Sequence, residues 1–424
     1  MRSRVPIHAL TQGPKHHCFG FHDICPWDET EQYVLALETD FLDRPPRAGE
    51  AATIGVVDTK NNNAFTPLAE TRAWNFQQGA RQQWLPNTKE TIIYNDYRDG
   101  KFVSVIHHRT EGEVRILPHP VYAIDPKGAY GYGLNFARLQ AHGGYGYRGG
   151  EKEKDEKPIP ERDGIWKINL ETGERELIVS IRDVVDVDPP HTNGSEYHYI
   201  THVVPNPSGT RLACIHKWKM QDGGFRNRLM ISDTDGKNIH HIPIQLSHFD
   251  WRTDTEILAW GRARETLMRL REKNIFKNPL LKPVLWLARK TRKRMRQKLV
   301  GDRYLLCNEV TRAITSVGVG TLIEDGHPSF SPDGTWLITD TYPDSTHHRT
   351  LILYNWETKK KIDLAKLPSL PDASYGVPDN WDLSEMRSDF HPRWNRSGTA
   401  VCFDSVHEGS KQMYVADLKD IVHS

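Results

Sequence analysis

Five histidines occupy the same position in a repeat that runs along the chain. Imidazole is the side chain best suited to proton transfer and metal binding near neutral pH. The clearest copies begin at His327 (His-Pro-Ser-Phe-Ser-Pro-Asp-Gly) and His391 (His-Pro-Arg-Trp-Asn-Arg-Ser-Gly), and related copies begin at His202 and His248. His22 heads a looser copy of the same pattern. The repeat therefore marks a set of imidazoles that a regular fold could bring together.

The elements that carry these histidines are short strands. In the clear copies a turn residue follows the histidine by seven positions, and an apolar strand such as Trp336–Ile338 comes next. Two further copies place Arg81 and Val121 where the others have histidine. Repeats of roughly 40–50 residues with short strands and Gly/Asp turns are typical of β-propellers. Seven copies predict an all-β, seven-bladed β-propeller in which the strand near Gln412–Asp417 closes against the N-terminal chain.

The first strand of each propeller blade is the innermost one, so equivalent positions in different blades point toward one axis. The repeat therefore predicts a funnel lined by His22, Arg81, His202, His248, His327 and His391. The alternative is structural, with each histidine capping a turn or bonding the backbone of a neighbouring blade.

Composition agrees with one large β domain spanning residues 1–424. Hydrophobic residues make up 37% of the chain, and the net charge is +1, which gives no indication of nucleic-acid binding. The five cysteines are scattered and form no CxxC pair, so a disulfide framework or structural zinc site is not expected. No apolar run resembles a signal peptide or a membrane span. These features predict a cytoplasmic protein without an organic cofactor.

A basic insertion interrupts the repeat at residues 262–300 and is expected to be helical. Its apolar stretch Val284–Ala288 is followed directly by the cation-rich segment Arg289–Lys298. A basic amphipathic segment of this kind can lie on an anionic membrane surface. The sequence thus predicts peripheral membrane contact through residues 278–299. Two alternatives stay open: a solvated helical excursion, or a positive lip that attracts an acidic polymer.

A funnel of imidazoles with an arginine and nearby tyrosines suits an anionic substrate with an acidic C–H bond, such as a uronic acid. Elimination requires neutralisation of the carboxylate, removal of the C5 proton by a neutral histidine, and protonation of the leaving oxygen. His248 or His202 is the candidate base, and Arg81 is the candidate carboxylate ligand. Tyr145 and Tyr147, in a Gly/Tyr loop, are candidate proton donors or ordinary loop residues. Hydrolysis would instead require a pair of carboxylates across the bond.

The blades beginning at Gly326-His-Pro-Ser-Phe-Ser-Pro-Asp-Gly and Asp389-Phe-His-Pro-Arg-Trp resemble those of oligogalacturonate lyase. The resemblance implies a seven-bladed propeller that cleaves short uronic-acid chains with a manganese-type ion, a histidine base and an arginine. The opening segment His17–Trp27 is also similar to propeller-type ulvan lyases, which use His, Tyr and Arg. Similar Ser-Pro-Asp-Gly blades also occur in TolB-like propellers without lyase activity.

Carried over by residue, the resemblance assigns His248 as base and makes His327 and His391 ligands of a divalent Mn- or Zn-type ion. The family has Gln-x-x-His-x-His before its last blade. Here the corresponding stretch is Met386-Arg-Ser-Asp-Phe-His, so the glutamine is missing and Asp389 replaces the first histidine. Asp389 can complete the metal site. Alternatively, Arg387 supplies the positive charge.

The sequence as a whole predicts a polysaccharide lyase that acts on uronic-acid-containing oligo- or polysaccharides by β-elimination. His22, Arg138 and Arg387 are further candidates for substrate binding. Two other functions remain open: a non-catalytic propeller that binds glycan or protein at a membrane surface, and a glycoside hydrolase on the same scaffold.

Overall fold

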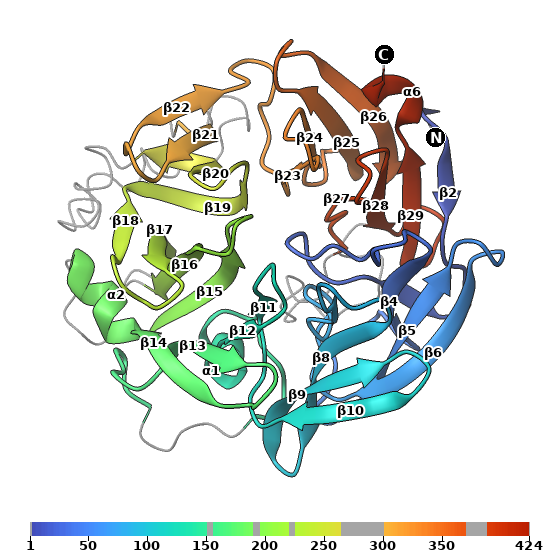
Figure 1. Cartoon of the computed structure of the whole chain (residues 1–424). Helices are drawn as coiled ribbons and strands as arrows, with labels where there is room; N and C mark the ends of the chain where they lie inside the picture. The colour runs from blue at the N-terminus through green and yellow to red at the C-terminus, as the bar shows by residue number, and fades with distance from the viewer. Residues whose placement is uncertain are drawn as a thin grey trace.

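The computed structural model describes residues 2–150, 156–189, 196–219, 225–263, 301–369 and 388–423. Their strands form seven antiparallel sheets. The sheets surround a central axis as the blades of a propeller, so the predicted seven-bladed fold is confirmed (Figure 1).

Within each blade the strands follow one another in sequence order, with the first strand nearest the axis (Figure 1). The first four blades are β3–β6 (His16–Cys18, Tyr33–Thr39, Ala52–Asp58, Ala64–Thr71), β7–β10 (Gln83–Trp84, Thr91–Arg98, Lys101–His108, Gly112–Leu117), β11–β14 (Ala123–Ile124, Tyr130–Gly133, Gly164–Asn169, Arg175–Ser180) and β15–β18 (His198–Pro205, Arg211–Lys219, Phe225–Asp233, His240–Ile242). The last three are β19–β22 (Ile244–Trp251, Glu256–Ala263, Arg303–Asn308, Ile314–Val317), β23–β26 (Ser329–Phe330, Trp336–Thr339, His348–Asn355, Lys361–Pro368) and β27–β29 (Arg393–Trp394, Ala400–Ser405, Gln412–Asp417).

The ring closes through the N-terminal chain. β2 (Ile7–Ala9) completes blade 7 by pairing with β29, with Ile7 opposite Ala416 and Ala9 opposite Tyr414. β1 (Arg2–Ser3) adds a fifth strand to blade 6 by pairing with β26. The two ends of the chain therefore lie side by side in Figure 1, as the sequence predicts.

A bulky residue lies three positions after the histidine position of the repeat. In three blades this residue is a tryptophan that links neighbouring blades. The indole N–H groups of Trp84, Trp251 and Trp394 donate to backbone oxygens of the preceding blade region, at 2.8, 3.1 and 3.1 Å. These tryptophans are buried, so each bond satisfies a polar group that would otherwise be costly to bury. The repeat thus fixes blade spacing and, with it, the position of each first strand relative to the axis.

Short helices complete the described chain: α1 (Phe136–His142), α2 (Ile181–Val187) and α6 (Lys419–Val422). Most of the basic insertion predicted at 262–300 lies outside the described residues, and so does the segment 278–299 expected at a membrane surface. Within the described part of the chain, no helix combines the length and apolar character required to span a bilayer.

Candidate active site on the propeller axis

The structure brings the five register histidines together. The His22 ring lies at the centre, with its centroid 5.3–6.1 Å from those of His202, His248, His327 and His391. His327 also lies 4.2 Å from His248 and 4.5 Å from His391, measured between ring centroids. All five side chains are buried, although they come from five different blades or blade connections.

Local backbone distortion points these side chains inward. The pairing of β15 with β16 shifts register between Thr201 and Val204, and the pairing of β19 with β20 shifts between Leu246 and Phe249. Such bulges re-aim side chains and are common beside active sites. His202 and His391 have positive φ angles of 55° and 46°. This left-handed conformation costs a non-glycine residue about 1–3 kcal/mol and is concentrated at functional sites.

Each of four histidines has its Nδ1 atom engaged away from the cluster. His327 Nδ1 lies 2.9 Å from Asp340 Oδ1, and His248 Nδ1 lies 3.1 Å from Asp325 Oδ1. His391 Nδ1 lies 3.1 Å from the Gly20 carbonyl oxygen. His202 Nδ1 lies 3.0 Å from Thr201 Oγ1. The carboxylate and carbonyl partners accept from Nδ1–H, which fixes the tautomer of those three rings and leaves Nε2 for a proton or a metal, whereas the Thr201 hydroxyl can donate or accept.

The site holds its imidazoles mainly in the neutral form. Burial, together with the neighbouring imidazoles, lowers the pKa of His22 well below its ordinary value. Burial likewise lowers the pKa values of His202 and His391, and to a lesser degree that of His248. His327 is the exception: burial acts against its charge, but the adjacent Asp340 carboxylate raises its pKa. Neutral imidazoles can accept a proton or coordinate a metal.

A metal-binding geometry is present at one side of the cluster. The buried residues His327, Asp389 and His391 can each offer a ligand atom, and these atoms all lie within 4.8 Å of one another. His391 Nε2 is buried and has no hydrogen-bond partner in the described part of the chain. The Arg349 Nη2 atom lies 2.7 Å from Asp389 Oδ1, so an arginine partly compensates the charge of this carboxylate. The residues therefore fit a divalent ion that takes nitrogen and oxygen ligands.

Three further side chains at the site were not identified from the sequence. Lys217, on β16, has its Nζ atom 5.4 Å from the Tyr145 ring centroid, and Tyr145 lies beside His202 at 5.7 Å. Tyr342 lies 6.2 Å from His248 and 6.0 Å from His327, again between ring centroids. Phe21 contacts His202 and His391 edge to face. Lys217 and Tyr342 lie outside the repeated positions, so the register gave no signal for them.

Lys217 is notable because its charge is not compensated. Among the residues that the structure describes, no carboxylate lies within ion-pair distance of its Nζ atom. Burial lowers the pKa of the Lys217 ammonium to about 8. The positive charge of Lys217 also helps to lower the pKa of His202. A desolvated cation without a partner is suited to an anionic ligand.

Arg81 does not have the role predicted for it. It occupies the expected register position with a φ of 53°. However, its guanidinium forms a bidentate pair with Asp23 at 2.8 and 2.9 Å, donates to the Tyr122 carbonyl and lies 3.9 Å from the Tyr122 ring centroid. Both partners of the ion pair are buried. Arg81 thus connects neighbouring blades, and each of its three guanidinium nitrogens already donates to a group of the protein.

We expect the substitution Asp23→Ala to lower the free energy of unfolding by about 3–5 kcal/mol, because it leaves the Arg81 charge buried and unpaired. The double substitution Asp23→Leu/Arg81→Met removes both charges and should cost less than the single one. Urea unfolding of the three proteins measures the difference. If Asp23→Ala unfolds like the unmodified protein, Arg81 does not depend on this pair and returns as a candidate ligand.

Two other predicted residues also lie elsewhere. Tyr147 is a core residue: it is 1% exposed, stacks on Phe136 at 4.3 Å and accepts a hydrogen bond from Asn95, so it is not the proton donor. Arg138, on α1, donates to the His198 and Pro158 carbonyl oxygens and pairs with Glu156, so it holds chain segments together. Arg387 lies outside the described residues.

The fold and the site define a seven-bladed propeller with an axial cluster of imidazoles. Oligogalacturonate lyase from Vibrio parahaemolyticus is similar in structure, with a TM-score of 0.59 and 12% identity over 98% of this chain and 94% of that one. The tricorn protease aligns at a TM-score of 0.50 with 11% identity, over 97% of this chain and 35% of that one. A second oligogalacturonate lyase, in complex with manganese, aligns at 0.43 with 14% identity, over 100% and 95% of the chains. At identities of 12% and 11%, the first two similarities show the fold alone.

No protein-family model matches the sequence, and no curated protein matches it either.

Proposed function

We propose that the axial site cleaves a uronic-acid-containing glycan by β-elimination. The observation that carries this proposal is the convergence of five buried imidazoles with an uncompensated lysine and two tyrosines. In the reaction a base removes the C5 proton, a C4=C5 double bond forms, the C4–O bond breaks, and the leaving oxygen receives a proton. Each of these tasks has a candidate among the described side chains.

Lys217 is the proposed ligand of the substrate carboxylate. Its ammonium is desolvated and lies beside the Tyr145 ring, which in turn contacts His202. Placing a carboxylate beside this ammonium would stabilise both charges, and the interaction strengthens as negative charge spreads onto the carboxylate during proton removal. Lys217 thereby takes the role that the sequence suggested for Arg81.

His248 is the proposed base. Its Nδ1 atom contacts Asp325, a carboxylate that orients the ring and stabilises the imidazolium formed after proton transfer. The partner of His202 is the neutral Thr201 hydroxyl, which offers no such stabilisation. Burial lowers the pKa of His248, so the ring is neutral and ready to accept a proton near pH 7.

Tyr145 is the proposed proton donor to the leaving oxygen. It is half-buried beside His202 and Lys217, whereas Tyr147 is enclosed in the core. The two tyrosines differ because the backbone oxygen of Gly146, the residue between them, accepts a hydrogen bond from the Asn75 side chain. This contact fixes the loop with Tyr145 toward the axis and Tyr147 toward Phe136.

Three carboxylates near the axis are already engaged by other groups of the protein. Asp23 is paired with Arg81, and Asp340 with His327. Asp250 accepts a hydrogen bond from the Phe330 backbone and lies 3.8 Å from Arg393. A hydrolase needs two carboxylates available on opposite sides of the scissile bond. Each of these three carboxylates already has a partner in the protein.

A divalent ion would be held by His327, Asp389 and His391. When bound, it would neutralise the substrate carboxylate and make the neighbouring C–H bond more acidic. Asp340 orients His327, and the Gly20 carbonyl orients His391. Partners that orient metal-binding side chains in this way strengthen the binding of the metal.

We expect protein purified without added metal to retain a divalent ion that His391→Ala loses. The reason is that a site of two imidazoles and one carboxylate needs each of its ligands. Elemental analysis of both proteins measures the effect, and His407→Ala, which removes a histidine outside the cluster, is the matched control. Equal metal content in all three proteins would show that His391 does not bind the ion and would contradict the proposed metal site.

The reaction class is tested by a screen of acidic polysaccharides. Elimination forms a conjugated double bond that absorbs in the ultraviolet, whereas hydrolysis forms reducing ends without this absorbance. Running the screen with and without a chelator separates metal-dependent turnover from metal-independent turnover. Binding of a glycan without either product would favour the non-catalytic alternative.

A further inference from the structure

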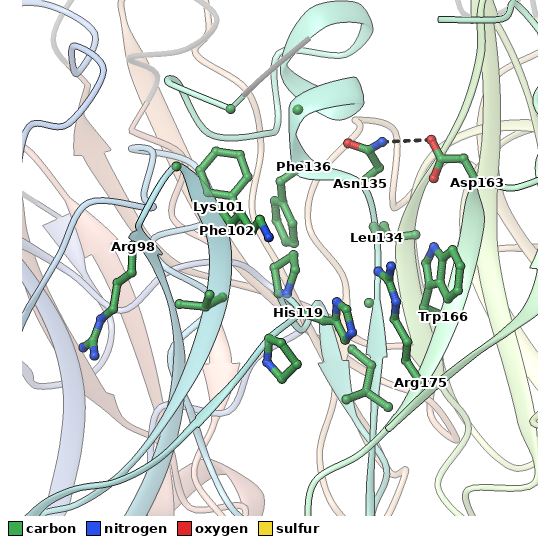
Figure 2. Close-up of a pocket in the computed structure, with 18 of the residues that line it drawn as sticks. Arg98, Lys101, Phe102, His119, Leu134, Asn135, Phe136, Asp163, Trp166 and Arg175 are labelled. Carbon is green, nitrogen blue, oxygen red and sulfur yellow. Dashed lines mark hydrogen bonds between the residues drawn. The ribbon is translucent and has the colours of Figure 1, made fainter. Parts of the chain in front are cut away.

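A cavity of about 740 Å³ lies between blades 2 and 3, away from the axial histidines. One wall comes from the β8–β9 turn and the start of β9, including Lys101 and Phe102, and the other from β13 and β14, including Trp166 and Arg175 (Figure 2). His119, in the connection between the two blades, lies between the walls. The volume of the cavity falls within the range of about 300–1,000 Å³ typical of small-molecule sites. The axial imidazoles do not line this cavity.

The cavity has a small excess of positive charge. Lys101, Arg162 and Arg175 line it and are exposed. In the part of the chain that the structure describes, none of the three has a carboxylate within ion-pair distance. Two carboxylates, Asp99 and Asp163, also line the cavity, and Asp163 interacts electrostatically with Arg175, so these three cations exceed the two carboxylates by one charge. Arg98 pairs with Asp96 and Glu113 and so adds little.

The wall residues combine charge with flat apolar surface. The Arg175 guanidinium lies 4.1 Å from the Trp166 ring centroid, an arrangement that holds the arginine in place before any ligand arrives. Phe102 presents a half-buried ring on the opposite wall (Figure 2). Burial and the nearby Arg175 lower the pKa of His119 to about 4, so its neutral ring can both donate and accept hydrogen bonds.

We propose that this cavity is a second, non-catalytic binding site for an acidic oligosaccharide. Arg175, Lys101 and Arg162 would bind the carboxylates, Trp166 would hold Arg175 in place, and Phe102 would contact the apolar face of a sugar ring. His119 would form a hydrogen bond with a hydroxyl group of the sugar. The choice of a saccharide rests on the proposed function of the axial site, while the anionic character of the ligand rests on the cavity alone. A second site would hold a long chain near the axis and raise its local concentration.

The test uses galacturonate oligomers and titration calorimetry on His248→Ala protein, which would bind but not cleave. The His248→Ala protein should show two binding events. Adding Arg175→Gln or Trp166→Leu should raise the Kd of one of them about tenfold or more, the effect expected when a charge-assisted hydrogen bond is lost. The matched control is Arg252→Gln. Arg252 also lies over a tryptophan, Trp356 at 4.8 Å, but it is paired with Glu256 and lies outside this cavity.

Turnover gives a second readout in the protein with His248 intact. Arg175→Gln should leave the turnover of short oligomers unchanged and raise KM for long chains. Unchanged binding in both cavity variants, or no saccharide binding at all, would overturn the inference. Tighter binding of a nucleotide or inorganic phosphate in the cavity would overturn the ligand class. If saccharide binds in an Arg175-dependent way but no protein cleaves it, the inference stands and the proposed function fails.

Discussion

Replacing His248 with alanine is expected to lower the turnover of an acidic glycan by about 10²–10⁴-fold, the usual contribution of a general base. The physical reason is the position of this imidazole, whose Nδ1 atom contacts Asp325 and whose ring contacts His327. The loss should appear in kcat, because the base interacts with the proton being transferred in the transition state and not in the bound substrate. Initial rates of formation of the unsaturated product measure it.

Two further variants make this prediction specific. Asp325→Asn keeps the size of the side chain but removes its charge, so it should also lower kcat, by a smaller factor than His248→Ala. His202→Ala tests the rival base, whose partner is only the Thr201 hydroxyl. Thermal unfolding of each variant shows whether the propeller is intact. If His202→Ala abolishes turnover while folded His248→Ala retains it, the two histidines exchange roles.

Replacing Lys217 with methionine should lower kcat/KM for uronate substrates by about 10²–10³-fold, the magnitude seen when one preorganised charge-stabilising group is lost. Methionine keeps much of the volume of the lysine side chain but carries no charge. Lys219→Met is the matched control, because Lys219 is on the same strand and exposed to solvent. Equal kcat/KM values for Lys217→Met and the unmodified protein would remove Lys217 from the site.

The same residue predicts a pH dependence. Because burial lowers the pKa of Lys217 to about 8, the ammonium is present below that pH and is lost as the pH rises through it. The free-enzyme profile, kcat/KM against pH, should therefore fall above about pH 8. Lys217→Arg should move this fall to higher pH, since a guanidinium stays protonated. An alkaline limb that is identical in the Lys217→Arg variant would contradict the assignment.

The propeller and the histidine cluster could be predicted because both depend on local spacing. The interval from His327 to Gly334, or from His391 to Gly398, places a turn and a strand after each histidine. In both turns the glycine adopts the left-handed conformation, with φ values of 70° and 68°. Such short-range constraints repeat in each blade, so the sequence specifies which positions face the axis.

The electrostatic roles could not be predicted in this way, because they depend on partners far apart in the chain. Arg81 has the right position for a ligand, but its partner Asp23 comes from another blade. Lys217 has no counterpart in the repeat, and only its burial without a carboxylate distinguishes it from the other lysines. Tyr145 and Tyr147 are two residues apart and equally plausible in sequence, yet packing on Phe136 assigns Tyr147 to the core.

The most direct test of the axial site as a lyase is the mass of its products from a defined uronic-acid oligomer. Elimination moves a proton within the reactants and adds no water, so the masses of the two fragments should sum to the mass of the substrate. We expect this result for the unmodified protein, with the unsaturated ring on the fragment that carries the new non-reducing end. Fragments whose summed mass exceeds the substrate by one water would identify a hydrolase and contradict the account.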